Sequence, residues 1–250
     1  ATVSSNVGTF TTLRLGDNNI GTLNIAPGAV LGTTGQSLMG LAGGGNGAVI
    51  NHTGGSYTSG GTLFLGYADS NTANYTMSGN ASLTAQGAMF ARFGNAQFTQ
   101  NSGSVQVDVD LVWGEGGTAA TLANYDLLGG TLNVTGIAGI GRGIGGELAG
   151  SDGRINIAGG TATFGDVLFG ANGGTDTAVI DISGAGVLNV LSANYSIADA
   201  LADIGNNITG SGLVVSTVNI GGADYTQIAV PEPASLVLLS LGAVAVLRRR

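Results

Sequence analysis

The chain has 250 residues, of which 47 are glycine and 9% are charged, whereas average proteins have about 7% glycine and about 25% charged residues. It has no lysine, no cysteine and one histidine, which excludes Schiff-base chemistry, disulfide scaffolds, thiolate metal sites and multi-histidine metal sites within one chain. Residues 1–247 hold all 15 acidic residues but only four of the seven basic ones, so we expect no nucleic-acid binding and, since no cofactor motif is found, no cofactor.

A short pattern recurs along the chain: an apolar lead residue, a short polar residue and a second, mostly apolar residue, followed by glycine. The pattern returns at nearly regular intervals, and a short repeating unit of this kind is typical of solenoids, in which each unit is stable only when it is stacked on its neighbours. The lead residues are Leu23, Ile50, Tyr75, Phe98, Tyr125, Ile155 and Ile180.

A second landmark is a short apolar run that ends in glycine and lies between each lead and the next. The residues that precede these glycines, including one copy before the first lead, are Leu15, Met39, Leu65, Phe93, Trp113, Ile140 and Phe169. Period-two alternation around both landmarks predicts two or three short strands in each unit. We therefore expect an all-β protein, a parallel β-solenoid and specifically a right-handed β-helix of about seven rungs, with both apolar series stacked inside.

The residues that follow the leads are short and polar, which predicts an outward ladder of hydrogen-bonding side chains. They are Asn24, Asn51, Thr76, Thr99, Asp126, Asn156 and Asp181. The corner between each landmark glycine and the next lead varies in length, so any binding specificity is expected there. Glu115 and Arg142 each follow a landmark glycine in adjacent rungs and are expected to pair across this corner.

The repeat breaks after Ile182, and a terminal cap is expected over residues 190–229 of a solenoid body that spans 1–229. Ser196 is expected to begin a short helix that ends at Gly205. Its predicted packing face consists of Ile197, Leu201 and Ile204. Two strands, from Leu213 to Ile220 and from Tyr225 to Val230, are expected to close the end of the rod.

Residues 230–250 form a separate tail with three parts. Val230, Pro231, Glu232 and Pro233 precede an apolar stretch from Leu236 to Leu247, and Arg248, Arg249 and Arg250 end the chain. This stretch of 12 residues is short for a permanent membrane span of about 20, and the three arginines would hold its end on the cytoplasmic side. Because the stretch has no polar face, we expect a helix that projects from the body with few contacts to the rungs.

This three-part order resembles the PEP-CTERM sorting signal of Gram-negative bacteria. The resemblance implies an exported protein that is held briefly in the inner membrane, is processed near Pro231-Glu232-Pro233 by an exosortase and passes to the cell surface or extracellular matrix, with exopolysaccharide as a further partner. The body, from about residue 9 to 190, resembles autotransporter-associated β-strand repeats.

Two acidic residues are the best candidates for chemistry in the body. Asp108 and Asp110 alternate with apolar residues and are expected to share an outward face of one strand. Such a pair could act as acid and base in glycoside cleavage or contribute to a calcium site, or it could belong to a solvated strand face. The loop residues Asp17, Asp69, Asp152 and Asp176 lack calcium-loop spacing and are expected to serve turns.

The remaining candidates have structural interpretations as well as functional ones. His52 and Gln100 lie two residues after a lead and are expected to be hydrogen-bonded residues at strand ends. Trp113, Phe93 and Phe169 could stack on sugars but are expected in the core, whereas Tyr57, Tyr67 and Tyr195 are candidates for the surface.

The function expected from these features is that of a secreted, non-enzymatic structural or adhesive surface protein. The main alternative is a polysaccharide-active β-helix enzyme, either a lyase or a glycoside hydrolase. A phage-spike or ice-binding solenoid is a further alternative, although ice binding would require a repeated Thr-x-Thr array that is not evident in the sequence.

Overall fold

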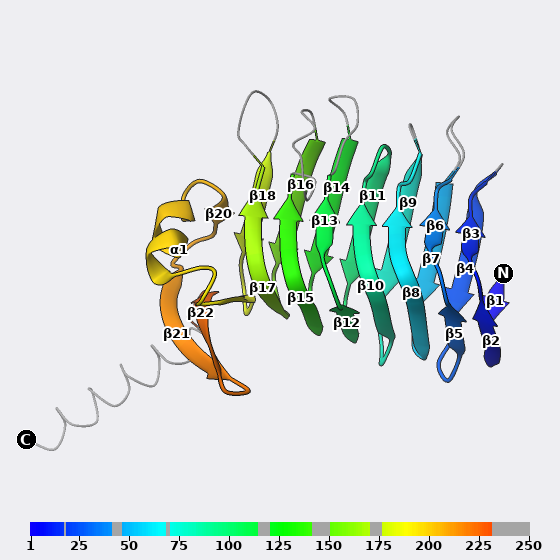
Figure 1. The fold of residues 1–250 in the computed structure, drawn as a ribbon, viewed down its shortest axis with the longest axis horizontal. Coiled ribbons are helices and arrows are strands. Elements are labelled where there is room, and N and C mark those ends of the chain that lie inside the picture. The colour runs from blue at the N-terminus through cyan, green and yellow to red at the C-terminus, as the bar shows by residue number, and fades with distance from the viewer. Residues whose placement is uncertain are drawn as a thin grey trace, which may run out of the picture.

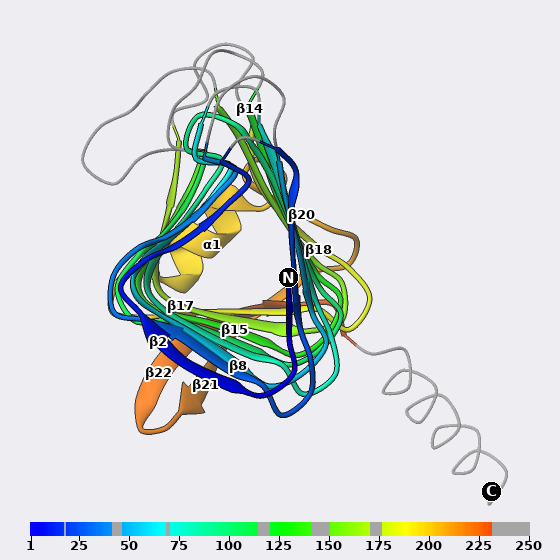
Figure 2. The ribbon, with the colours of Figure 1, turned by 90° about the vertical axis from the view of Figure 1, so that its right-hand side faces the viewer.

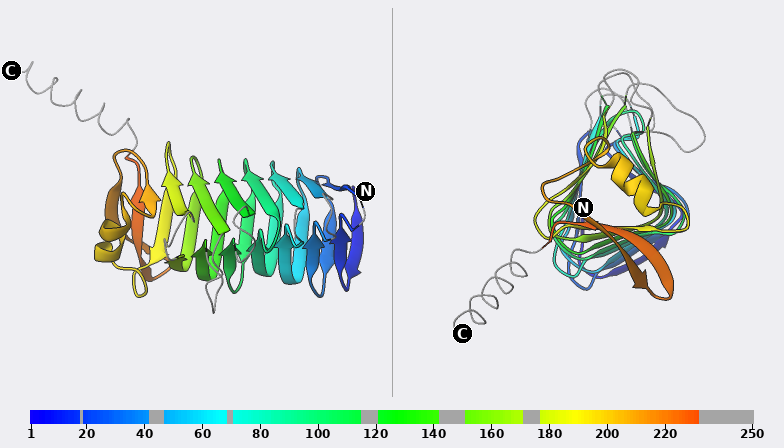
Figure 3. Two further views of the ribbon diagram at one scale, coloured as in Figure 1. Left: turned by 90° about the horizontal axis from the view of Figure 1, so that it is seen from above. Right: turned by 90° about the vertical axis from the view of Figure 1, so that its left-hand side faces the viewer.

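The protein is described here by a computed structural model, which covers residues 1–17, 19–41, 47–68, 71–114, 121–141, 151–170 and 177–231. The chain winds into a rod in which each turn is stacked on the one before, from the N-terminus at one end to a cap at the other (Figures 1 and 3). Its strands pair in parallel along the rod for about seven turns. The predicted all-β parallel solenoid is therefore confirmed, while the predicted apolar helix of the tail lies outside the described residues.

One side of the rod is a parallel sheet to which each turn contributes one strand, and we call its outer surface face A. Within the described residues this sheet has nine strands. In spatial order they are β1 (Thr2–Val3), β4 (Gly21–Ile25), β7 (Gly47–His52), β9 (Thr72–Met77), β11 (Asn95–Gln100), β14 (Thr121–Leu127), β16 (Ser151–Ile157), β18 (Ala178–Ile182) and β20 (Ile208–Thr209).

The other two sides belong to a second sheet, which has thirteen strands in the described part of the chain and bends within each turn, so that the rod has a three-sided outline (Figure 2). The bend coincides with register shifts between Ala85 and Gly87 and between Val134 and Ile137. Its strands are β2 (Asn6–Phe10), β3 (Leu13–Leu15), β5 (Val30–Thr33), β6 (Ser37–Met39), β8 (Ser56–Leu65), β10 (Ser82–Phe90), β12 (Ser104–Val107), β13 (Leu111–Trp113), β15 (Thr131–Ile140), β17 (Thr161–Phe169), β19 (Val187–Leu191), β21 (Val214–Ile220) and β22 (Ala223–Ala229).

The lead residues form the first internal stack, as predicted. Each lead pairs in register with the next one along the rod, from Leu23 to Ile180, and Ile208 of β20 extends the series. All seven leads are buried. A fully buried side chain of this size stabilises the fold by about 1.5–3 kcal/mol, so this stack is a main source of cohesion between turns.

The second internal stack differs from the prediction at one turn. Leu65 pairs with Phe90, and Phe90 pairs with Trp113, whereas Phe93 is 37% exposed. The assignment of Phe93 to the core is therefore wrong, and Phe90 takes its place. The other predicted members do stack, with Leu15 and Phe169 half-buried at the two ends.

The error has a clear conformational cause. The residue after the stacked position has a positive φ in neighbouring turns, as at Gly66 (67°) and Gly114 (69°), which is why glycine marks this corner. In the deviant turn that conformation is adopted by Ala91, with φ of 54°, the one non-glycine residue with positive φ in the described part of the chain. Gly94, three residues later, therefore gives a misleading landmark.

The cap begins with α1 (Ile197–Asp203), close to the predicted bounds. Ser196 is the N-cap: its side chain accepts a hydrogen bond from the Asp199 N–H, and the Asp199 carboxylate accepts one from the Ser196 N–H at 2.8 Å. The Ser196 hydroxyl, which donates to Asp199 Oδ2 at 2.7 Å, and the Ser196 N–H together lower the pKa of Asp199. Two of the three residues of the predicted packing face are wrong, however, because Ala200 is the buried residue of the helix while Ile197 and Leu201 are 40% and 60% exposed.

The packing of α1 follows from its neighbour. Tyr195, which directly precedes the N-cap, is buried in the core and supplies the large side chain at this end of the rod. Because Ala200 is small, the short helix can lie close to the core around Tyr195. Ile204 is the predicted contact that does pack on the core. Beyond the helix, β22 pairs antiparallel with β19, and β21 pairs antiparallel with β22, which closes one sheet edge as predicted.

Candidate functional site

The sorting segment begins where the last strand of the body ends. β22 stops at Ala229, Val230 packs partly against the core, and Pro231 is exposed. Glu232, Pro233 and the arginines 248–250 lie outside the described residues, as do Glu115 and Arg142 of the predicted ion pair. Proline at 231 cannot donate a sheet hydrogen bond, so the end of pairing coincides with the start of the sorting segment.

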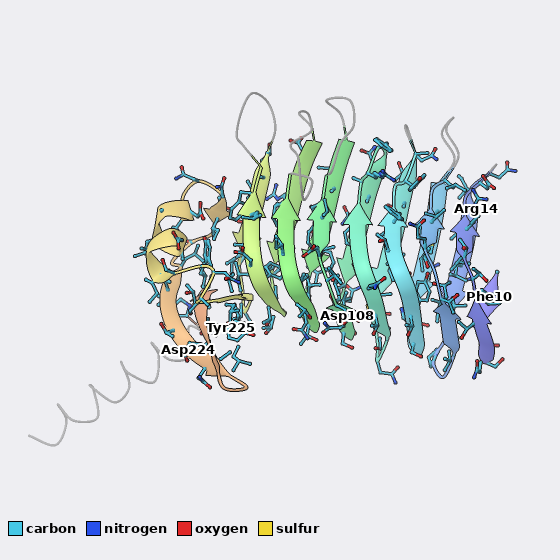
Figure 4. All side chains as sticks on the ribbon, viewed as in Figure 1. Phe10, Arg14, Asp108, Asp224 and Tyr225 are labelled. Atoms are coloured by element: carbon cyan, nitrogen blue, oxygen red, sulfur yellow. The ribbon has the colours of Figure 1, made fainter. Side chains whose placement is uncertain are left out.

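The two candidate catalytic acids do not lie on a strand. β12 ends at Val107 and β13 begins at Leu111, so Asp108 and Asp110 occupy the bend between them. Asp110 is half-buried, and its Oδ1 accepts a hydrogen bond from the Ile137 N–H of the next turn at 2.7 Å. Asp108 is exposed on the outside of the rod (Figure 4). Asp110 thus satisfies a backbone donor that the bend leaves outside the ladder.

A third acid at the same bend was not identified from the sequence. Ile137 lies one turn beyond Asp110, and Asp166 pairs in register with Ile137 in the turn after that. Partial burial raises the pKa of Asp166, although its Oδ1 accepts a hydrogen bond from the Val167 N–H at 2.8 Å. Ile137 therefore separates the two carboxylates along the rod. Within the described ranges, no group of three or more histidine, aspartate or glutamate residues could hold a metal ion.

The loop acids can be followed only in part. Asp152 lies in strand β16 rather than in a loop, so the predicted turn role is wrong for this residue; its Oδ1 accepts a hydrogen bond from the Thr177 N–H of the next turn at 2.7 Å. Asp17 is exposed, and Asp69 and Asp176 lie outside the described residues.

The one histidine is part of a buried hydrogen-bonded pair. His52 ends β7, is fully buried, and places Nδ1 2.9 Å from the Tyr75 hydroxyl and Nε2 3.3 Å from the Gly55 carbonyl oxygen. Because a carbonyl only accepts, Nε2 carries the proton and the Tyr75 hydroxyl donates to Nδ1. Burial lowers the pKa of His52, so the neutral form is favoured. The predicted role as a hydrogen-bonded residue at a strand end is confirmed.

Gln100 repeats this arrangement two turns further along the rod. It ends β11, is fully buried, and its Oε1 accepts a hydrogen bond from the Tyr125 hydroxyl at 2.5 Å. Its Nε2 donates to the carbonyl oxygens of Gly103 and Thr131, both at 3.0 Å. In both cases a tyrosine at a lead position is served by a polar residue of the preceding turn, a sequence signal that would have identified the pairs.

The aromatic residues are concentrated in the middle of the core. The rings of Tyr75, Phe98 and Tyr125 stack with centroids 4.6 Å apart, and Trp113 is fully buried against Tyr125. Burial raises the pKa of both tyrosines. The predicted core position of Trp113 is confirmed.

Two of the predicted surface tyrosines are buried instead. Tyr57 is fully buried within β8, and Tyr195 is buried with its hydroxyl donating to Asp203 Oδ2 at 2.7 Å. Tyr57 faces inward because it alternates along β8 with the outward polar residues Ser56 and Thr58.

A small aromatic cluster at the surface surrounds one arginine. The guanidinium carbon of Arg92 lies 5.1 Å from the ring centre of Phe93, 5.4 Å from that of Tyr67 and 5.6 Å from that of Phe64. Tyr67 is half-buried, so of the three tyrosines predicted at the surface it is the one that is partly exposed. The cluster stabilises the corner around Ala91 by cation–π contacts.

Face A carries the predicted polar ladder, and its side chains bond to one another across turns. Asn51 Nδ2 donates to Asn24 Oδ1 at 2.8 Å, and Asn156 Nδ2 donates to Asp126 Oδ1 at 2.5 Å. Thr209 Oγ1 donates to Asp181 Oδ1 at 2.7 Å. Most of this ladder is therefore satisfied within the protein.

A second polar ladder was not identified from the sequence. It lies on the outer surface of β8, β10, β12, β15 and β17 before their bend, and we call this surface face B. Two files of outward side chains run along it in register. The first file is Ser56, Ser82, Ser104, Thr131 and Thr161, and the second is Thr58, Thr84, Gln106, Asn133 and Thr163.

These features define a class of protein: a capped parallel β-solenoid followed directly by a C-terminal segment. Residues 229–250 match the model of the PEP-CTERM protein-sorting motif. The motif implies an exported protein with a membrane-held intermediate that an exosortase recognises and processes. No curated protein and no solved structure matches the chain significantly. In the described residues, no helix is both long and apolar enough to span a membrane.

Proposed function

We propose that this chain is a structural or adhesive protein of the bacterial cell surface or extracellular matrix, without enzymatic activity. The observation that carries the proposal is the attachment of a sorting motif to the last strand of a rod that consists of stacked, mutually bonded turns. Such a rod suits a structural or adhesive role because each turn offers the same outward surface to a partner.

The candidate catalytic side chains argue against an enzyme, because they form hydrogen bonds within the protein. Asp110 accepts a backbone hydrogen bond at the bend, His52 is buried and bonded to Tyr75, and Gln100 is buried and bonded to Tyr125. A glycosidase needs two carboxylates on either side of an accessible bond. The alternative, a polysaccharide-active enzyme, would have to use Asp108 with another accessible acid.

We further infer the pathway and the repeat type from the resemblance of the sequence. The host is a Gram-negative bacterium, the intermediate is held in the inner membrane by Leu236 to Leu247, and Arg248–Arg250 face the cytoplasm. The body is a right-handed member of the autotransporter-associated repeats, and exopolysaccharide surrounds the mature protein.

The pathway is tested in cells that contain an exosortase, by comparing the wild-type chain with the Glu232→Ala and Pro233→Ala variants. We expect the wild type in the surface and matrix fractions and the variants in the inner membrane. Equal distribution of all three proteins would contradict the proposal. An assay of reducing-end release from polysaccharides tests the enzymatic alternative, and turnover that is lost in Asp108→Asn would overturn the non-enzymatic role.

The independence of the tail is tested by deleting residues 231–250. The body completes its last strand at Ala229, so we expect nearly unchanged thermal stability. A fall in melting temperature of more than about 5 °C would show that the tail belongs to the fold.

A further inference from the structure

Face B combines many polar groups with an absence of charge. All ten of its ladder residues are serine, threonine, glutamine or asparagine, although the chain has 15 acidic and seven basic residues. None of the ten is buried. The surface therefore offers a regular array of neutral donors and acceptors to solvent.

These groups are also largely unused by the protein. Among the ten ladder residues, within the part of the chain that the structure describes, only Gln106 donates side-chain hydrogen bonds, to Thr135 Oγ1 at 3.1 Å and to the Val107 carbonyl at 3.3 Å. The remaining hydroxyls and the Asn133 amide are available for an external partner. A partner that bonds to them would gain directional contacts without displacing any bond inside the protein.

One end of face B is walled. A concavity of about 440 Å³ is lined by Gln106, Asn133 and Thr163 of the ladder and by Tyr225 of β22. The β21–β22 hairpin extends past the edge of the sheet on this side of the rod (Figures 2 and 3), and Tyr225 lies on it at the cap end (Figure 4). Tyr225 is half-buried, so part of its ring is accessible beside the amides.

We propose that face B binds a neutral polysaccharide strand that runs along the rod and ends against Tyr225. Each turn presents a pair of hydrogen-bonding side chains at a spacing of about 4.8 Å, which suits a polymer of hydroxyl-bearing units. An accessible tyrosine ring can pack on the apolar face of a sugar ring, while the neighbouring amides bond to its hydroxyls. The net charge of −8 disfavours an anionic polymer.

The arrangement suits ice less well than a glycan. An ice-binding surface needs a flat and uniform array, whereas face B mixes hydroxyls with the longer side chains of Gln106 and Asn133 and is hollowed beside Tyr225. Ice binding is therefore an outcome of the test rather than the proposal. The inference names a partner for the proposed surface function and rests on it.

The test is affinity electrophoresis of the full chain, kept soluble in neutral detergent, through gels that contain dextran, galactomannan or anionic alginate. We expect retardation by at least one neutral polymer and none by alginate. Asn133→Asp and Tyr225→Ala should each weaken retention about fivefold or more, because the first removes an amide donor and the second removes the ring. The matched controls are Thr76→Asp on face A and Phe10→Ala, an exposed aromatic residue on β2, which should behave as wild type.

Two results would overturn the proposal. One is the absence of retardation by every neutral polymer while the variants keep the wild-type circular dichroism, and the other is equal loss of retention in the two control variants. Inhibition of ice recrystallisation without glycan retention would assign face B to ice instead. If glycan binding fails but the wild type reaches the cell surface, only the binding proposal is contradicted. If glycan binding is retained but delivery to the surface fails, only the proposed sorting and location are contradicted.

Discussion

Faces A and B are built from the same turns but treat their polar side chains in opposite ways. On face A, Gln97 Nε2 donates to Asp126 Oδ2 at 2.8 Å, and Asn124 Nδ2 donates to Gln97 Oε1 at the same distance. Arg154 extends this network through Asn156 Oδ1 at 2.9 Å and through a marginal ion pair with Asp181 at 4.0 Å. On face B, the equivalent files of hydroxyls and amides bond to little within the described part of the protein.

The difference shows how a solenoid can separate cohesion from recognition. Side chains that bond across turns stabilise the stack, and carboxylates alternate there with amide partners, so like charges do not adjoin. Side chains that stay unbonded contribute little to folding but are ready for a ligand. Stability should therefore respond strongly to substitutions in the core and on face A, and weakly to those on face B.

The largest loss of stability is expected for Gln100→Leu, because Gln100 is fully buried. The variant keeps a similar volume but leaves the buried Tyr125 hydroxyl without its acceptor and removes the side-chain hydrogen bonds to the carbonyl oxygens of Gly103 and Thr131. We expect a loss of about 3 kcal/mol or more in the free energy of unfolding, measured by chemical denaturation. The double variant with Tyr125→Phe should recover part of this loss, and no recovery would show that the hydroxyl is not satisfied by Gln100.

The next effect is expected for Asp126→Ala on face A. Asp126 accepts hydrogen bonds from Gln97 and Asn156, at 2.8 and 2.5 Å, and is half-buried. Because hydrogen bonds to a charged group are stronger than neutral ones, we expect a loss of about 2 kcal/mol, less than for a buried site. Thermal denaturation measures it, and a loss equal to that of a face B variant would break the comparison.

A smaller, pH-dependent effect is expected from His52. Burial lowers the pKa of His52 in the folded state below its ordinary value of 6.5. The unfolded chain therefore binds more protons than the folded chain as the pH falls below about 6.5. The stability that the neutral histidine provides is present above this pH and declines as the pH falls toward its folded pKa, by at most about 1.4 kcal/mol per pH unit.

The control for this prediction is His52→Gln, which places at β7 the residue type that serves Tyr125 from β11. Melting temperatures of both proteins between pH 7 and 5 should diverge, with the wild type losing more on acidification. Parallel curves would mean that His52 is protonated equally in the folded and unfolded states.

The smallest expected effect is that of Asn133→Ala on face B, in the same turn as Asp126. Its side chain is exposed and makes no hydrogen bond within the described residues, so the free energy of unfolding should change by less than about 0.5 kcal/mol. Denaturation under the conditions used for Asp126→Ala gives the direct contrast. A loss above about 1 kcal/mol would show that face B also stabilises the fold.

Much of the architecture was predictable from sequence because it depends on local periodicity. The lead positions recur at nearly regular intervals, and all seven pair in register as expected. The N-cap at Ser196 and the sorting tail were recognisable for the same reason, since a capping box and a three-part signal are contiguous in the chain. Trp113, His52 and Gln100 also follow from their place in the repeat.

Only the tertiary structure decided which aromatic residues face the core at the corners. Phe90 replaces Phe93 because Ala91 adopts the left-handed conformation that glycine has in other turns. Tyr195, in the turn that precedes α1, is likewise buried. Alternation specifies side-chain direction within a strand, but every bend resets it, and no local signal reports by how much.

Face B was likewise invisible in the sequence, although each of its pairs, such as Ser82 and Thr84, can be read there. Its two files exist only because successive turns align Thr84 with Gln106 and Gln106 with Asn133. The sequence by itself determined that the chain forms stacked turns and ends in a sorting signal. The stacking register alone decided which polar residues bond to each other and which remain open to a partner, because that depends on contacts between residues far apart in the chain.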